Sequence, residues 1–205
     1  MLKNSAIISA LLLMLFSLTV SCEQKFKTQD DLLNFISEED NGYKYSKEVN
    51  GVKYILSYKP TDLLVIQEIN NKATTAEKDS LRKKYSSYMY FNLTMSRNNT
   101  ELLNIVARDK DQFGSLVNNL AFNMDAKLHL YTPEKDTIEM ADFIYPRMFG
   151  YSKSTDVLIV YPRTNKIIAA KQLYLTVEDL GFQTGEVKFK LDNTILQKEP
   201  QLSAN

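Results

Sequence analysis

A single cysteine, Cys22, and a single histidine, His129, limit how this chain can stabilise a fold. One cysteine excludes an intramolecular disulfide, and a site with several histidine or cysteine ligands, as in most zinc and copper proteins, is excluded by count. Of the 205 residues, 44% are hydrophobic and 24% are charged, which is an ordinary balance for a globular domain. We therefore expect a fold stabilised by its hydrophobic core, with no metal and no cofactor.

The overall charge does not favour any class of binding partner. Lysine plus arginine and aspartate plus glutamate both number 25, so the formal net charge is zero. A chain without net charge produces no long-range field that would favour nucleic acid or an acidic surface. Nucleic acid is not expected as a partner.

The first 21 residues have the pattern of a secretory signal peptide. Lys3 carries the only charge of this segment, and residues 6–20 carry none. A helix that crosses a bilayer needs about 20 apolar residues, so this run is short for a transmembrane span. A basic start, a short apolar middle and small residues at the end predict export and removal of residues 1–21. The alternative, a buried core helix, is disfavoured because such helices seldom begin a chain behind a lysine.

The end of this segment, Leu18-Thr19-Val20-Ser21-Cys22, resembles the lipobox of bacterial lipoproteins. The small Ser21 before the cysteine fits that pattern, whereas Thr19 stands where the family prefers leucine. The resemblance implies that the Cys22 thiol takes up a diacylglyceryl group and that the leader is cut before it. It also implies that the new amine is often acylated. Ordinary signal cleavage would instead leave Cys22 as a free thiol in a soluble periplasmic protein.

The same resemblance implies a place in the cell. Two or more acyl chains hold a protein stably on a membrane, whereas one chain gives only marginal binding. In the enterobacterial members, an aspartate after the cysteine favours the inner membrane, and this chain has Glu23. We therefore expect a lipid-anchored protein of the cell envelope, at the outer membrane rather than the inner, with residues 22–27 as a lipidated tether.

The rest of the chain is expected to form one domain of the α+β class over residues 28–192. The pattern predicts an antiparallel sheet or sandwich, helices mainly in the N-terminal half and a strand-rich C-terminal half. A boundary near residue 124 has no linker to support it. Residues 193–205 are expected to form a frayed polar tail.

Local patterns place the elements of the N-terminal half. Asn50-Gly51, between strands at 43–49 and 52–59, is a strong signal for a hairpin with a type I′ turn. The run 63–69 is either a short helix or a buried strand, since periodicity does not separate the two. Helices are expected from residue 28 to about 41, at 75–85, at 102–106 and around 113–120.

Strands dominate the remaining pattern. Residues 88–96 alternate strictly, which predicts a half-buried strand with Tyr88 and Tyr90 on its outward side. The uninterrupted apolar run 157–160 predicts a central strand. Further strands are expected at 127–131, 137–145, 156–161, 167–177 and 186–191.

Few residues offer catalytic chemistry. Nucleophilic catalysis with a histidine base would need His129, which the strand pattern places on an outward face. No G-x-S-x-G, P-loop or G-x-G-x-x-G motif occurs. The acidic clusters at 30–31 and 38–40 could serve glycoside cleavage if two carboxylates were held near 5 Å apart, but both lie at helix ends. Asp109-Lys110-Asp111 is the nearest approach to a calcium loop and lacks the other ligands.

Three functions remain open, and the first is preferred. The lipid anchor and the lack of a catalytic constellation favour a non-catalytic binding or structural role, as an accessory component of an envelope protein assembly. Tyr88 and Tyr90 are the candidate contact surface, because tyrosine is favoured at interfaces, although it is also common on any half-exposed strand. The alternatives are an envelope hydrolase that uses paired carboxylates and a lipoprotein that captures a nutrient or glycan. Tryptophan, a frequent platform for sugars, is absent, but there are 12 tyrosines and 10 phenylalanines.

Overall fold

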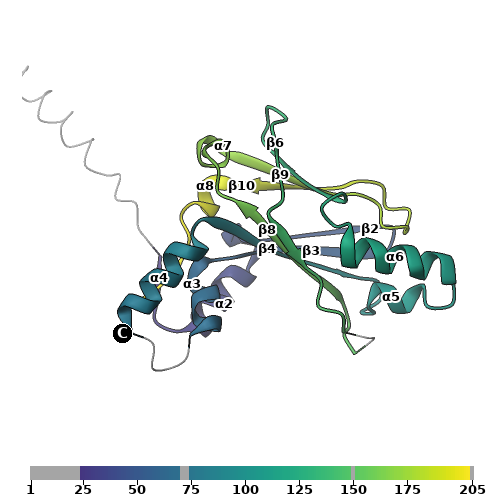
Figure 1. The fold of residues 1–205 in the computed structure, drawn as a ribbon, viewed down its shortest axis with the longest axis horizontal. Helices are drawn as coiled ribbons and strands as arrows, with labels where there is room; N and C mark the ends of the chain where they lie inside the picture. The colour runs from purple at the N-terminus through teal and green to yellow at the C-terminus, as the bar shows by residue number, and fades with distance from the viewer. Residues whose placement is uncertain (1–23, 70–73, 149–150, 204–205) are drawn as a thin grey trace, which may run out of the picture.

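The computed structural model describes residues 24–69, 74–148 and 151–203. In this part of the chain two antiparallel sheets lie face to face, and most helices gather at the ends of the sheets (Figure 1). The expected α+β class, with antiparallel sheets and a strand-rich C-terminal half, is confirmed. The predicted signal peptide and Cys22 lie outside the described residues.

The larger sheet has five strands in the order β2-β3-β4-β8-β7, each antiparallel to its neighbours. The expected hairpin is confirmed, because Asn50 and Gly51 have φ angles of 49° and 74°, as a type I′ turn requires. The apolar run 157–160 lies in β8, which has a strand on each side as predicted. The five strands are β2 (Lys44–Val49), β3 (Val52–Lys59), β4 (Tyr88–Ser96), β7 (Asp142–Ile144) and β8 (Thr155–Pro162).

The smaller sheet has four strands in the order β10-β9-β5-β6, also antiparallel. These strands are β5 (Leu128–Tyr131), β6 (Thr137–Ile138), β9 (Gln172–Val177) and β10 (Val187–Asp192). Every second residue of β10 is buried and the others are exposed, so one face of this sheet turns to the core and the other to solvent.

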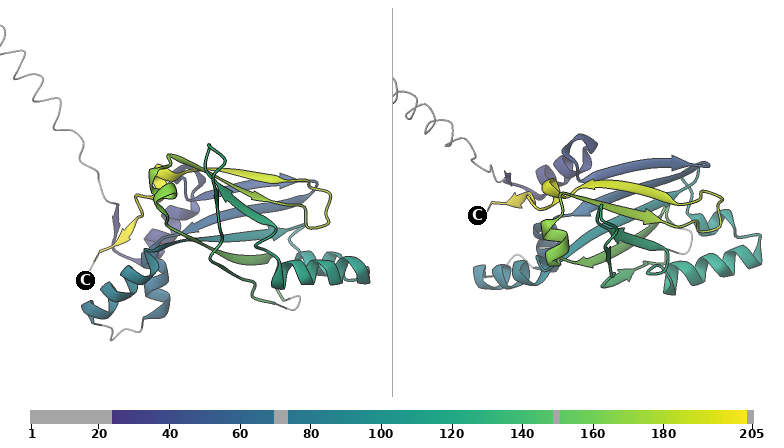
Figure 2. Two further views of the ribbon diagram at one scale, coloured as in Figure 1. Left: turned by 45° about the horizontal axis from the view of Figure 1, so that its top comes forward. Right: turned by 90° about the horizontal axis from the view of Figure 1, so that it is seen from above.

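Two groups of helices lie at opposite ends of the sheets (Figures 1 and 2). One end carries α2 (Gln29–Ser37), α3 (Thr61–Glu68) and α4 (Thr75–Tyr85), and the other carries α5 (Leu102–Ile105) and α6 (Lys110–Phe122). The open choice at residues 63–69 is settled as helix, since α3 begins directly after Pro60. Three short helices complete the set: η1 (Glu39–Asn41), α7 (Asn165–Ala169) and α8 (Asn193–Leu196).

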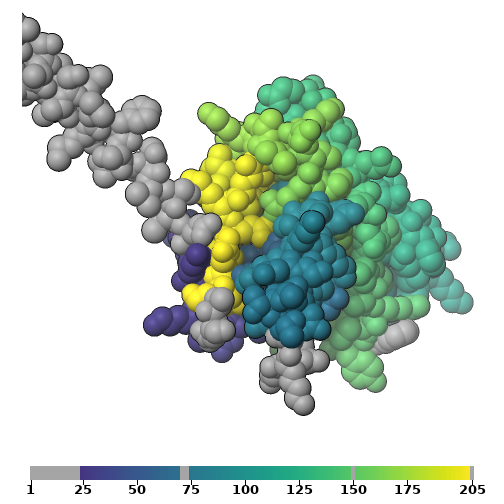
Figure 3. Space-filling model, turned by 60° about the vertical axis from the view of Figure 1, so that its left-hand side comes forward, coloured from purple at the N-terminus to yellow at the C-terminus, as the bar shows by residue number. Residues whose placement is uncertain are grey.

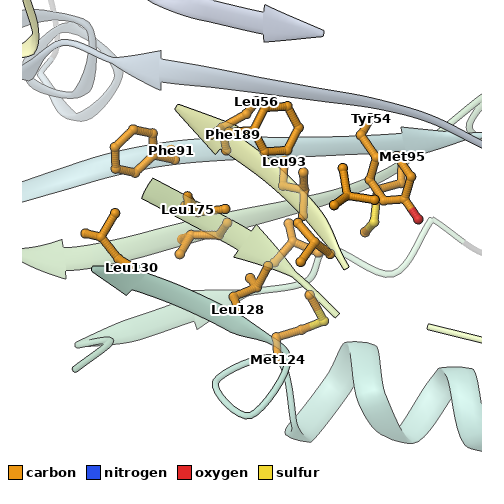
Figure 4. Packing of buried hydrophobic residues seen from close by; sticks show 14 of the residues in the cluster. Tyr54, Leu56, Phe91, Leu93, Met95, Met124, Leu128, Leu130, Leu175 and Phe189 are labelled. Atoms are coloured by element: carbon orange, nitrogen blue, oxygen red, sulfur yellow. The ribbon is translucent and has the colours of Figure 1, made fainter. Parts of the chain in front are cut away.

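The core fills the space between the two sheets. Leu56, Phe91 and Leu93 of the larger sheet face Leu175 and Phe189 of the smaller one, and all five are at most 1% exposed (Figure 4). Burying one side chain of this kind stabilises a fold by about 1.5–3 kcal/mol. The side chains that point into the core are the alternate residues of each strand. The alternating apolar pattern therefore explains where the strands lie.

Two expected strands are wrong in detail. The segment 137–145 forms two short strands in different sheets, β6 beside β5 and β7 beside β8, so the chain crosses from one sheet to the other between them. The segment 167–177 begins with helix α7 rather than strand. The buried Asn193 side chain donates hydrogen bonds of 2.7 Å to the carbonyls of both Ile167 and Ala170. These bonds satisfy carbonyls at the end of α7, and their donor lies far along the chain.

The expected tether and tail are also wrong in part, because both segments are built into the fold. β1 (Lys25–Phe26) pairs in parallel with β11 (Gln201–Leu202), and α8 lies within the supposed tail. The Tyr43 hydroxyl lies 3.2 Å from the Ile195 carbonyl oxygen and 3.1 Å from that of Lys198. A polar composition suggested fraying, but backbone pairing and buried side chains hold this segment.

Candidate functional site

The paired strands β1 and β11 lie at the end of the molecule that carries α3 and α4. Figure 3 looks onto this end, where the yellow C-terminal segment lies beside the blue helices. The Gln201 amide donates to the Gln24 carbonyl and the Ser203 amide to the Phe26 carbonyl, both at 2.8 Å. The Phe26 ring packs on Phe35 of α2 with ring centroids 5.0 Å apart. The first described residues are therefore fixed to the body of the domain.

A largely buried charge cluster holds the segment before β11 in place. The Glu199 carboxylate accepts hydrogen bonds from the Arg163 guanidinium, the Tyr58 hydroxyl and, at 2.8 Å, the Thr61 amide. Burial raises the pKa of the Tyr58 hydroxyl far above its usual value, so Tyr58 stays a neutral donor. A charged pair with several hydrogen bonds can persist inside a protein because its polar atoms are satisfied.

A second ion pair holds β11 itself. The Asp62 carboxylate, in the first turn of α3, accepts from Nε and Nη2 of Arg82 at 2.7 and 3.3 Å. It also accepts from the Leu202 amide at 2.7 Å. The hydrogen bond to Asp62 raises the pKa of the Arg82 guanidinium. Asp62 thus links three segments that are distant in sequence: α3, α4 and β11.

A cavity of about 410 Å³ opens between these two ion pairs and β11. We call it the terminal-strand pocket. Its charged residues are two acids held in ion pairs and three cations. Its lining consists of Lys25, Thr61, Asp62, Arg82, Lys83, Ser86 and residues 199–203.

The outward side of the five-stranded sheet is a second candidate surface. The helices gather near its ends rather than over its middle (Figure 2). We call this surface the outer sheet face; its central members are Ile55 and Ser57 of β3, Tyr90, Asn92 and Thr94 of β4, and Asp156 and Leu158 of β8. These seven side chains are all partly exposed.

The two tyrosines predicted as a contact surface lie together at one end of the outer sheet face. Tyr88 is 38% exposed and Tyr90 is half-buried, and their ring centroids are 6.4 Å apart. The Tyr85 ring packs edge-on to Tyr90 at 5.8 Å. The Tyr85 hydroxyl donates to Glu68, which also pairs with Lys84. The result is an aromatic cluster whose outer ring remains accessible.

A polar network occupies the middle of the same face. The Asp156 carboxylate accepts hydrogen bonds from Asn92 at 3.0 Å, Thr94 at 2.5 Å and Ser154 at 2.8 Å. The partly exposed apolar residues Ile55 and Leu158 lie next to this network in the strand register. A surface with apolar, aromatic and hydrogen-bonding groups side by side is typical of a protein contact region.

The other candidate residues have structural partners. His129 points outward as expected, and its Nε2 lies 2.9 Å from a Glu178 carboxylate oxygen. Hydrogen bonds from Lys127 and His129 lower the pKa of Glu178, the opposite of what a general acid at neutral pH needs. Asp109 caps α6 by accepting from two backbone amides.

The acidic clusters serve the ends of helix α2. Asp30 and Asp31 lie in its first turn, where negative charge is favoured by the helix dipole. Beyond its C-terminus, Glu39 accepts a hydrogen bond from Ser46 of β2. Among the described residues, no group of three or more histidine, cysteine, aspartate or glutamate side chains is placed to hold a metal ion. In the same residues, no helix has the length and apolar character to cross a bilayer.

The sequence did not predict that the residues of the terminal-strand pocket come together. Asp62 and Arg82 were visible only as helix residues, and Glu199 lay in the expected tail. These residues meet through contacts between positions that are 20 to 140 residues apart in the chain. A single sequence predicts such contacts only through alternation or a motif, and neither is present at these sites.

A comparison of this chain with protein-family models, with curated proteins and with solved structures found no match in any of the three. The functional argument therefore rests on the sequence pattern at Cys22 and on the geometry of the described residues.

Proposed function

We propose that this protein is a lipid-anchored component of the cell envelope, at the outer membrane, with a non-catalytic binding role. The lipid on Cys22 holds it on the membrane, and the outer sheet face contacts one or more proteins of an envelope assembly. The lipobox-like leader supports the anchor, and the exposed mixed surface supports the binding role.

One observation carries the proposal. The strand that follows Cys22 most closely, β1, is hydrogen bonded into the fold through β11. An anchor attached at that point would hold the whole domain close to the membrane in a restricted orientation, rather than on a long tether. Such an arrangement suits a protein that presents one face to neighbours in the envelope.

The anchor is tested by labelling cells with a palmitate analogue. The wild-type chain is expected to incorporate the label and to stay with membranes, and the Cys22→Ala chain is expected to lose both. Label that persists after the substitution would refute the anchor, because no other cysteine is present to carry the diacylglyceryl group.

The binding surface is tested by photo-crosslinking in intact cells. A crosslinking amino acid in place of Ser57, in the middle of the outer sheet face, is expected to yield a discrete adduct with an envelope protein. Tyr88→Ala should weaken that adduct, since tyrosine is enriched among interface residues that contribute most to binding.

The matched control is Tyr151→Ala, which removes a tyrosine that is 92% exposed and lies outside the outer sheet face. It should leave the adduct unchanged. Equal loss of the adduct in both variants, or no adduct at all, would argue against this surface.

A further inference from the structure

The covalent chain limits how far the terminal-strand pocket can lie from the proposed lipid. Lys25 is the third residue after Cys22, and three residues span at most about 11 Å. The headgroup layer of one leaflet is roughly 5–8 Å thick, and charges interact over a Debye length of about 8 Å at physiological salt. Because β1 belongs to the wall of the pocket through Lys25, the pocket lies within reach of the lipid headgroups.

The charges around the pocket favour an anion. Its acids are already satisfied, Asp62 by Arg82 and Glu199 by Arg163. Lys83 also lines the pocket, is exposed and has no ion-pair partner in the described part of the chain. Arg82 has five N–H donors, of which two bond to Asp62, and its Nη1 also lies 3.5 Å from the exposed Asp79 carboxylate. The Ser86 hydroxyl supplies a further polar group at the wall.

We infer that the terminal-strand pocket binds the phosphate of an anionic phospholipid headgroup, with Lys83 and Arg82 as the cations and Ser86 at the wall beside them. The contact adds a second attachment beside the acyl chains and fixes which face the domain turns to the bilayer. The outer sheet face is then presented in one orientation. This inference rests on the proposed lipid anchor.

The test measures the reactivity of Lys83 in the lipidated protein on vesicles. A neutral acetylating reagent modifies only the uncharged amine, so binding to a phosphate slows the reaction. The protein is placed on vesicles of phosphatidylcholine alone and on vesicles that also contain phosphatidylglycerol, and modification is read by mass spectrometry. We expect acetylation of Lys83 to slow by about fivefold with phosphatidylglycerol, the factor that corresponds to one lysine at an anionic surface. Lys78, on the same helix but outside the pocket, should change little.

A matched pair of variants separates the pocket from the general surface potential. Ser86 and Ser87 are both exposed, and both hydroxyls donate to the Lys83 carbonyl at 3.2 Å, but only Ser86 lines the pocket. Ser86→Glu places a carboxylate in the pocket and should abolish the slowing caused by phosphatidylglycerol. Ser87→Glu should retain it.

The outcomes distinguish the inference from the function on which it rests. Protein that fails to stay on either kind of vesicle refutes the anchor, and the inference falls with it. Protein that stays on the vesicles with Lys83 equally reactive on both, or with Ser86→Glu and Ser87→Glu alike, overturns the pocket and leaves the anchor. Equal protection by inorganic phosphate added to phosphatidylcholine vesicles also overturns it, because the site would then bind free anions rather than lipid.

Discussion

The carboxylate of Glu199 pairs with the guanidinium of Arg163 inside the molecule, where the two side chains are only 15% and 16% exposed. Arg163 follows β8 of the larger sheet, and Glu199 lies between α8 and β11. This pair therefore joins the C-terminal segment to the sheet, and through β11 it supports β1 as well. The stability of the end nearest Cys22 should depend on it.

Glu199→Gln is expected to lower the free energy of unfolding by about 2–4 kcal/mol, because it leaves the Arg163 charge buried without its partner. Urea denaturation followed by circular dichroism measures the change. Asp136→Asn is the control, since the Asp136–Lys166 pair is 53% and 59% exposed and exposed pairs contribute about 0–1 kcal/mol. Equal effects of the two substitutions would contradict a buried role for Glu199.

Gly42→Ala should destabilise the protein, whereas Gly114→Ala should not. Gly42 has a φ of +77°, and an added Cβ would lie 2.7 Å from Ile195 Cδ1. The left-handed conformation alone costs a residue with a Cβ about 1–2 kcal/mol. Gly114 lies within α6, and an added Cβ would meet no atom within 4 Å, so alanine there should stabilise by about 0.5–1 kcal/mol. Thermal unfolding of both variants checks the opposite signs, and a stable Gly42→Ala chain would count against the contact with Ile195.

Asn193→Ala should destabilise the protein by about 1–3 kcal/mol, because the Ile167 and Ala170 carbonyls each lose the hydrogen bond from the buried Asn193 amide. Gln197→Ala provides the comparison. Its amide donates to the Ile168 carbonyl at 3.0 Å, but the side chain is exposed, so water can replace that bond. Hydrogen exchange of the α7 amides should rise in the first variant only. A similar rise in both would show that Asn193 does not hold the end of α7.

Tyr43 should make stability depend on alkaline pH. Burial raises the pKa of its hydroxyl from 10.0 to about 12, so folding favours the neutral form. A raised pKa gives a contribution that is fully present below pH 10 and is lost as the pH rises toward 12. Tyr43→Phe should be less stable than wild type by about 1 kcal/mol at neutral pH through its lost hydrogen bond, and this difference should shrink between pH 10 and 12. Denaturation at several pH values measures it, with the exposed Tyr151→Phe as a variant that should match wild type throughout.

Much of the architecture was predictable from local pattern. The alternation at 88–96, the Asn50-Gly51 turn and the apolar run at 157–160 led to the correct strands, because each pattern reflects which face the backbone geometry buries. The errors came where partners distant in sequence decide the conformation. Residues 167–169 are apolar enough for a strand, but the Asn193 side chain satisfies the carbonyls of a helix there. The segment 137–145 divides between two sheets because its first part pairs with β5 and its second part pairs with β8.

The candidate surfaces show the same contrast between what local sequence pattern predicts and what contacts between distant residues decide. Tyr88 and Tyr90 were placed outward by alternation alone, and the structure adds that they lie together with Tyr85. The terminal-strand pocket could not be predicted, since Asp62, Arg82 and Glu199 each look like ordinary charged residues of a helix or a tail.

By itself, the sequence determined the strand faces, the hairpin, the absence of an intramolecular disulfide and the lipobox-like pattern at Cys22, because these depend on neighbours or on residue counts. Only the tertiary structure decided that β1 and β11 pair and that polar terminal residues become buried. The physical reason is that a buried charge or an unpaired backbone group is stable only beside a complementary partner, and these partners come from distant parts of the chain.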